Sequence, residues 1–197
     1  MSDLARDDLE RILSALGAVL EARGLRYEVV LVGGANLLLR GVIARPTKDG
    51  DLIGQRLDTG AVIAMRELPP ALVRAVGDVA TAYGLAPDWL NVGPQALIDL
   101  GLPAGFASRL TCRRFGALGI WSAGVYDMIC FKLYAAADHW PTRDRHIADL
   151  RALAPTPGQL ISAAAWARSH DPSSGFRSML VAVLEHLGME DADVALE

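Results

Sequence analysis

The chain of 197 residues is poor in several features that define common classes of protein. It has only two cysteines, Cys112 and Cys130, without a CxxC pair or a nearby histidine pair, so neither a disulfide framework nor a zinc site is indicated. We expect both to be buried free thiols. Its longest apolar runs, such as 161–167, are far shorter than the roughly 18 residues of a membrane-spanning helix. The N-terminal segment is acidic and unlike a secretory signal, which predicts a cytoplasmic protein without membrane contact.

Several catalytic motifs are also missing. The four histidines have no HxxxH or HExxH spacing, no serine lies in a GxSxG setting, and no Walker A lysine motif is present. Gly33-Gly34 lacks the third glycine of a dinucleotide-binding turn. The net charge of −4 argues against a broad nucleic-acid-binding surface, so any such contact must be local. The densest basic residues are Arg113, Arg114, Arg143 and Arg145.

The pattern of apolar residues nevertheless predicts a folded α+β protein, because hydrophobic residues make up 52% of the chain. Residues 1–123 are expected to form a mixed sheet with a few helices, and residues 124–197 a helical domain. The predicted strands are 27–34, one that follows 45–54, 61–66, 108–115 and 117–121, and the predicted helices are 3–23, 35–40, 69–83, 125–138, 143–153, 157–169 and 174–187. Ser2 or Asp3 is expected to cap the first helix, residues 85–94 to form a loop, and the acidic end 190–197 to fray.

The most informative stretch pairs Gly33-Gly34 with Asp49-Gly50-Asp51. Residues two apart in a strand project from the same face, so Asp49 and Asp51 would converge on one point. Mg²⁺ prefers carboxylate oxygens and bridges to substrate phosphates, while glycines let backbone N–H groups approach a phosphate closely at the start of a helix. The combination predicts a site for phosphoryl or nucleotidyl transfer. The alternative is that Asp49-Gly50 forms a solvated hairpin turn without a metal.

Lys132 is also unusual, because its neighbours at helical spacing are small or apolar. Its ammonium group would either reach the surface along its own stem, or meet a phosphate or a carboxylate such as Asp149 on the next helix. The residues themselves favour neither alternative.

Five short blocks in succession resemble those of the AbiEii/MenT-type nucleotidyltransferase toxins, within the polymerase-beta-like nucleotidyltransferase superfamily. The blocks are Leu31-Val-Gly-Gly-Ala-Asn36, Arg45-Pro-Thr-Lys-Asp-Gly-Asp-Leu52, Pro87-Asp-Trp-Leu-Asn91, Phe131-Lys-Leu-Tyr-Ala-Ala136 and Arg143-Asp-Arg-His-Ile-Ala-Asp-Leu150. The resemblance implies a polymerase-beta-like core with a mixed sheet, followed by a C-terminal helical bundle that completes the active site. It also implies the toxin of a toxin–antitoxin pair, which adds nucleotides from an NTP to the 3′ end of tRNA and so blocks translation.

The resemblance assigns roles to seven residues. It implies that Asp49 and Asp51 bind Mg²⁺ and that Gly33, Gly34 and Lys132 bind the nucleotide, with Asp49, Asp51, Lys132 and Asp149 catalytic. Thr47 matches a nucleotide-site hydroxyl that a cognate antitoxin can phosphorylate or block.

The sequence departs from this pattern at two places. Gly50 replaces an apolar strand residue, and the strands from 108 to 121 carry no third carboxylate. Asp88 lies in an expected loop, and Asn91 has no charge with which to replace the missing acid. Two alternatives therefore remain: a nucleotidyltransferase fold that has lost catalysis and acts as a binding protein, or a transferase that modifies a small molecule or a protein hydroxyl.

Overall fold

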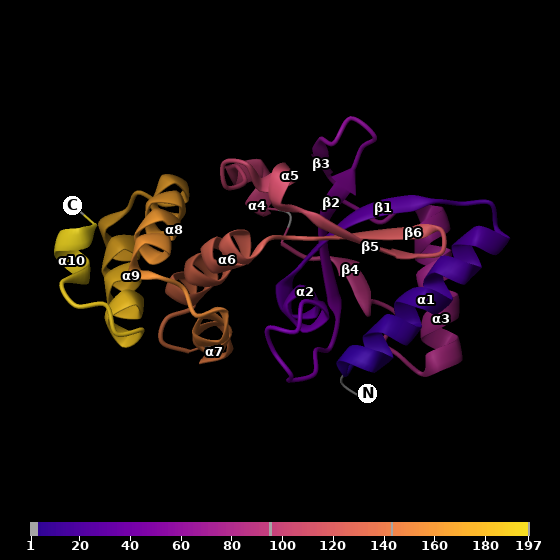
Figure 1. The fold of residues 1–197 in the computed structure, drawn as a ribbon, viewed down its shortest axis with the longest axis horizontal. Coiled ribbons are helices and arrows are strands. Elements are labelled where there is room, and N and C mark those ends of the chain that lie inside the picture. Colours follow the sequence, from indigo (N-terminus) through magenta and orange to yellow (C-terminus); the bar gives the residue numbers. More distant parts are fainter. Residues whose placement is uncertain (1–3, 95, 143, 197) are drawn as a thin grey trace. The chain divides into compact units, whose positions relative to one another are not determined.

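The computed structural model describes residues 4–94, 96–142 and 144–196, which form helices and a mixed sheet as expected for an α+β protein (Figure 1). Contacts divide the chain into two compact units, Met1–Ala123 and Gly124–Glu197. Within the described ranges, no helix combines the length and the apolar composition needed to span a bilayer.

The described part of the first unit contains one six-stranded sheet. Its strands are β1 (Tyr27–Val32), β2 (Gly50–Arg56), β3 (Val62–Ala64), β4 (Leu90–Val92), β5 (Thr111–Phe115) and β6 (Leu118–Ser122). The order is β3-β2-β1-β6-β5, and β4 also pairs with β2. β1 is parallel to β6 and antiparallel to β2, while β2 is antiparallel to β3 and parallel to β4. β2 therefore has neighbours on both edges at its first residues, which fixes the backbone of that end.

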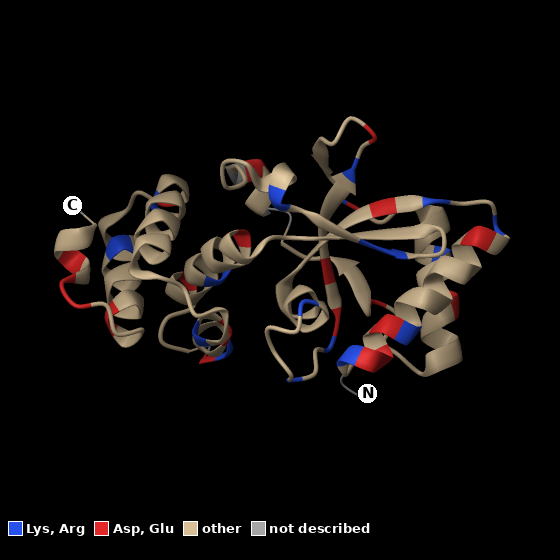
Figure 2. Cartoon of the chain, in the orientation of Figure 1, with Lys and Arg blue, Asp and Glu red and all other residues tan. Residues whose placement is uncertain are grey.

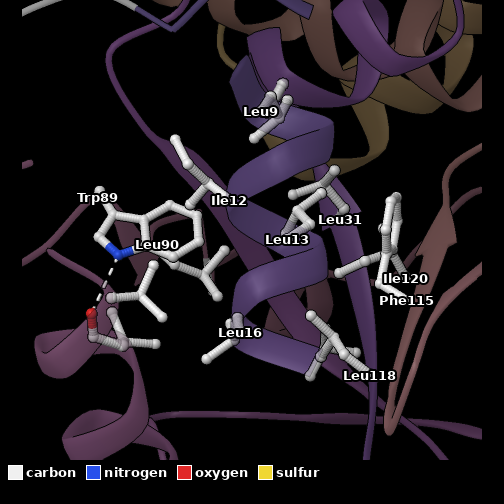
Figure 3. Packing of buried hydrophobic residues seen from close by; sticks show 14 of the residues in the cluster. Leu9, Ile12, Leu13, Leu16, Leu31, Trp89, Leu90, Phe115, Leu118 and Ile120 are labelled. Carbon is white, nitrogen blue, oxygen red and sulfur yellow. Dashed lines mark hydrogen bonds between the residues drawn. The ribbon is translucent and has the colours of Figure 1, made fainter. Parts of the chain in front are cut away.

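The two sides of the sheet differ in their partners. Val29 and Leu31 of β1 point into a core built with α1 (Arg6–Ala22) and α3 (Pro70–Tyr83), whereas Val30 and Val32 point to the opposite face. In Figure 3, side chains of α1 pack against those of β1, β6 and the Trp89-Leu90 segment. Trp89 is buried, and its indole N–H donates to the Val76 carbonyl oxygen over 3.2 Å, so this polar group keeps a partner within the core.

The second unit is helical within the residues described. Its elements are α6 (Val125–Asp138), α7 (Asp144–Leu153), α8 (Pro157–His170), α9 (Ser174–His186) and α10 (Ala192–Ala195). α6 packs against α7, α8 and α9 and buries residues on most of its circumference, as expected of a central helix. Thr156 and Gln159 form a capping box at the start of α8, and the Ser173 hydroxyl caps α9.

Most predicted elements are confirmed, but several boundaries and short elements were wrong. α1 begins at Arg6, and the predicted caps Ser2 and Asp3 lie outside the described residues. The expected loop 85–94 contains β4, and the acidic end contains α10. The short helices α4 (Ala96–Leu100) and α5 (Phe106–Arg109) were not predicted, and α5 occupies the expected beginning of the strand that starts at Thr111.

The prediction for the cysteines is half right. Cys130 is buried in α6, but Cys112 is exposed. Cys112 pairs with Trp121 at the edge of the sheet, on the face opposite the α1 core, where no helix of that core can cover it.

Candidate active site

The diglycine turn joins β1 directly to α2 (Gly33–Leu39). Gly33 has a φ of +72°, a conformation that side chains other than glycine rarely adopt, and the helix begins there rather than at Ala35. Two hydrogen bonds hold α2 to the end of β6: Asn36 Nδ2 donates to the Ala123 carbonyl and Arg40 Nη2 to the Ser122 carbonyl, each over 3.1 Å. The helix that follows the turn is thus anchored to the end of β6.

Asp51 lies against this turn. It is the second residue of β2 and pairs with Val32, the last residue of β1. A Cβ atom added at Gly33 would overlap Oδ2 of the Asp51 carboxylate, so the carboxylate occupies the space that the missing side chain leaves free. The carboxylate is half-buried. The sheet therefore places one acid beside the backbone of the first glycine.

Asn91 and Gly93 enclose the same carboxylate from the other edge of β2. Asn91 pairs with Asp51 in the parallel β2–β4 ladder, so the two side chains share a face of the sheet. A Cβ at Gly93 would lie 2.7 Å from Oδ1 of Asp51 and 3.3 Å from Oδ1 of Asn91. The Asn91 amide nitrogen donates to the Asp88 carbonyl over 3.2 Å, which directs its oxygen away from that bond. A neutral oxygen therefore lies beside Asp51. It belongs to β4, within the segment 85–94 that the sequence predicts as a loop.

Asp49 comes immediately before β2 and is half-buried. Its backbone carbonyl accepts a hydrogen bond from the Thr47 hydroxyl over 3.1 Å. The next residue, Gly50, pairs with Leu90 and donates its N–H to the Trp89 carbonyl over 2.7 Å. Asp49-Gly50 is therefore the entry to a strand, and the alternative of a hairpin turn is wrong. A Cβ at Gly50 would lie 2.9 Å from Leu90 Cδ1, so a side chain at this position would require Leu90 to shift.

Thr47 and Arg45 lie beside the second glycine. A Cβ at Gly34 would be 3.0 Å from the Thr47 hydroxyl oxygen and 3.9 Å from Nη1 of Arg45. Thr47 is buried and its backbone pairs with Leu4, whereas Arg45 is exposed. A hydroxyl group and a guanidinium thus lie at the corner where we expect phosphate to bind. No motif in the sequence indicates a role for Arg45.

These donors fit a magnesium ion. Mg²⁺ is commonly bound through one or two carboxylates together with substrate phosphates and water. Asp49 and Asp51 would supply the carboxylates, and the Asn91 oxygen would add a neutral donor beside that of Asp51. In the part of the chain that is described, no cluster of three or more acidic, histidine or cysteine side chains is arranged to hold a metal by itself. The nucleotide phosphates would therefore have to contribute ligands.

Lys132 and Asp149 form a buried ion pair in the second unit. Lys132 Nζ lies 2.8 Å from Asp149 Oδ2, and the two side chains are 9% and 1% exposed. The pair joins α6 to α7, and of the alternatives that the sequence left open, the carboxylate partner on the next helix is the one observed. Its contribution to catalysis stays a prediction of the resemblance.

His146 lies next to this pair on α7. Burial, together with the charges of Lys132 and Arg145, lowers the pKa of His146 from 6.5 to about 4. Neither ring nitrogen has a hydrogen-bond partner. The imidazole is therefore neutral near pH 7.

The arginines identified in the sequence are only partly available to an anion. Arg113 pairs with Glu10 over 2.8 Å and Arg114 with Glu28 over 2.9 Å. Arg145 is exposed, and Arg143 lies outside the described residues. Each of the two arginines of β5 thus already has an acidic partner.

An alanine at Gly33 is expected to damage the candidate site, because it would impose a strained φ and push a methyl group into the Asp51 carboxylate. We expect a loss of about 1–3 kcal/mol in the free energy of unfolding and weakened binding of Mg²⁺–nucleotide. Urea denaturation and calorimetry measure the two effects.

Gly77 provides the matched control, because it lies within α3 and an added Cβ would have no neighbour within 4 Å. Gly77→Ala should stabilise the protein by about 0.5–1 kcal/mol and leave nucleotide binding unchanged. Equal behaviour of the two alanine variants would contradict the placement of Asp51 against the turn.

Comparison with known proteins agrees with the fold. A search of curated proteins finds no match. An antigenic nucleotidyltransferase-like protein from Paracoccidioides brasiliensis has a similar fold, with a TM-score of 0.50 and 12% identity over 99% of this chain and 94% of that one. A family model described as nucleotidyltransferase of unknown function (DUF6036) matches residues 7–152. Since this match covers well over half of the sequence, the chain belongs to the DUF6036 nucleotidyltransferase family.

Proposed function

We propose that the protein is a Mg²⁺-dependent nucleotidyltransferase that transfers a nucleotide from an NTP to the 3′ end of an RNA, with tRNA as the expected acceptor. We further propose that it is the toxin of a toxin–antitoxin pair of the AbiEii/MenT type, whose activity blocks translation. The observation that carries the proposal is the position of the Asp51 carboxylate against the first glycine of the turn between β1 and α2.

Each part of the site has a chemical task in this proposal. Backbone N–H groups of Gly33 and Gly34 bind the triphosphate, which no side chain at these positions obstructs. Arg45, next to Gly34, adds positive charge. Asp49 and Asp51 would hold the magnesium ion, which supplies neutralisation of the phosphate charge as a Lewis acid. Lys132 and Asp149, which the resemblance assigns to the nucleotide and to catalysis, stay predictions.

The reaction itself is an in-line displacement. The 3′ hydroxyl oxygen of the RNA forms a bond to the α-phosphorus of the NTP, the bond from that phosphorus to the oxygen of the β-phosphate breaks, and pyrophosphate leaves. The hydroxyl proton passes to a base, for which Asp51, Asp149 or water are the candidates. The chain's contribution is mainly to position the two substrates and to surround the triphosphate with complementary charge.

Transfer of label from α-³²P-labelled NTPs tests the proposal directly. The purified protein is incubated with each nucleotide and with tRNA, other RNA, protein or small-molecule acceptors. We expect label on tRNA, dependent on Mg²⁺, and arrest of growth when the chain is produced in a bacterial host without an antitoxin. Label only on a protein or a small molecule would support the alternative transferase instead.

A further prediction concerns Asn91, which lies where an additional acid would face Asp51. Asn91→Asp should lower the Mg²⁺ concentration needed for half-saturation by about tenfold, because ligand charge governs the affinity for hard cations. Calorimetric titration with Mg²⁺ measures the change. The control is Thr59→Asp, which adds the same charge at an exposed position of the β2–β3 turn. An unchanged affinity in Asn91→Asp would remove Asn91 from the site.

The second candidate function is that of a catalytically inactive binding protein. It is favoured by the lack, among the described residues, of a cluster of three acidic, histidine or cysteine side chains that could hold a metal. Such a protein need bind neither Mg²⁺ nor nucleotide, so calorimetry with both distinguishes the two functions.

A further inference from the structure

A polar cavity lies on the sheet of the first unit, away from the diglycine turn. Its volume is about 320 Å³, and three arginines, Arg26, Arg56 and Arg114, line it together with Glu28 and Trp121. Asp58 completes the charged lining, so the arginines exceed the acids by one. In Figure 2, blue segments on β5 and near the end of β2 accompany a red segment on β1.

Glu28 organises two of these arginines, Arg26 and Arg114. Its Oε1 accepts from Arg26 Nε over 3.2 Å and lies 2.9 Å from Arg114 Nη1, while its Oε2 accepts from the Trp121 indole over 2.7 Å. Although burial raises the pKa of Glu28, the hydrogen bonds from Arg114, Trp121 and Arg26 outweigh burial and lower it. The Arg26 and Arg114 side chains are still 68% and 45% exposed. Each guanidinium therefore keeps further N–H groups for an anion in solution.

Arg56 gives the cavity a planar wall. Its guanidinium carbon lies 3.9 Å above the centre of the Trp121 ring. A stacked guanidinium is held flat and presents its outer face to a base or its edge to a phosphate. The cavity thus combines donors for phosphate with a stacking surface.

The cavity and the Asp51 carboxylate share one face of the sheet. Glu28, Val30 and Val32 alternate onto the same side of β1; Trp121 pairs with Val30, and Asp51 with Val32. Glu28 is four residues before Val32, which places it about 13 Å away along the strand at about 3.3 Å per residue. The fully buried Val30 lies between the two ends.

The distance between the arginine cavity and the diglycine turn indicates which ligand the cavity binds. A triphosphate bound at Gly33 and Gly34 would not also fill a cavity so far along β1, whereas a polynucleotide carries a phosphate on every nucleotide. We propose that the arginine cavity binds a backbone phosphate of the acceptor RNA, on the 5′ side of the end that reacts. The inference rests on the proposed function for the identity of the acceptor, but binding is measurable without catalysis.

The test measures binding of a fluorescein-labelled short single-stranded RNA by anisotropy, without nucleotide, as a function of salt. Arg26→Gln/Arg114→Gln should lose about fivefold in affinity per arginine at about 0.1 M salt, with a slope of log K against log salt that is shallower by about 0.7 per lost contact. The control is Arg74→Gln, an exposed arginine on α3, which should bind as the wild type does. Circular dichroism verifies folding. The single variant Arg26→Gln removes the more exposed of the two arginines bound to Glu28 and leaves Glu28 its bonds to Arg114 and Trp121.

Two outcomes would overturn the inference. One is a wild-type affinity and salt slope in the folded double and single variants. The other is equally tight binding of free UMP, which would make the cavity a mononucleotide site. The supporting result also includes a higher KM for RNA in the variants with an unchanged KM for NTP. If RNA binding depends on the arginines but no nucleotide is ever transferred, the proposed function fails and the cavity assignment stands.

Discussion

Asp51→Asn is expected to reduce nucleotidyl transfer by at least about 10²–10³-fold, because it removes one charge from the site where phosphate charge must be balanced. Asparagine has almost the same shape, so it fits the space beside Gly33 and Gly93 that the carboxylate occupies. The fold should therefore survive. The measurement is kcat/KM for transfer of α-³²P-labelled nucleotide to RNA, together with the melting temperature.

The control for Asp51→Asn is Asp88→Asn, which makes the same change of charge in the exposed segment before β4. Asp49→Asn should also lose activity if both carboxylates hold the ion. Transfer at the wild-type rate in Asp51→Asn, or an equal loss in Asp88→Asn, would show that the chemistry occurs elsewhere. The Mg²⁺ dependence adds a second measure: a variant that still reacts should need more of the ion.

Local sequence signals were sufficient for much of the first unit. The apolar run 27–32 ending in two glycines predicts a buried strand followed by a sharp turn, because such a run needs burial on both faces and the turn needs a positive φ. The Asp58-Thr59-Gly60 turn predicts the β2–β3 hairpin, which is observed with a hydrogen bond from the Gly60 N–H to the Leu57 carbonyl. In both cases the information lies within a few residues.

β4 was missed because its information is not local. Leu90, Asn91 and Val92 are too few to show a period, and their strand conformation comes from pairing with β2, which lies far away in the sequence. If residues 85–94 are taken as a loop, Asn91 can be assessed only by its lack of charge and not by its position opposite Asp51. The buried pair Trp89-Leu90 was the signal available, since two large apolar residues in a supposed loop indicate burial.

In the helical unit, too, part of the information is not local to one element. The helices follow from their apolar spacing and from Pro and Gly punctuation, but a lysine among small and apolar neighbours is compatible with either of two environments. The choice depends on which residue of α7 faces Lys132. The helix packing supplies Asp149 at 2.8 Å, a contact that no property of α6 alone determines.

Lys132→Met is expected to destabilise the protein by about 3–5 kcal/mol, since it leaves the Asp149 carboxylate, only 1% exposed, without its cationic partner. Chemical denaturation measures the loss, and hydrogen exchange should locate it in α6 and α7. The control is Lys48→Met, which removes the other lysine of the chain from an exposed position and should change stability by less than about 0.5 kcal/mol.

The double variant Lys132→Met/Asp149→Leu separates the pair from its parts. Removing both charges also removes the buried carboxylate that has lost its lysine, so most of the stability should return, although the single changes are each costly. His146 supplies an independent readout. Burial is the main reason why its pKa is lowered to about 4, and the Lys132 charge adds to that effect, so Lys132→Met should raise the pKa of His146 while leaving it below 6.5. Stability that declines as the pH falls from 6.5 should then decline less steeply, because the folded state accepts the proton more readily. A Lys132→Met variant as stable as the wild type, with an unchanged His146 titration, would mean that the ion pair does not hold these helices together.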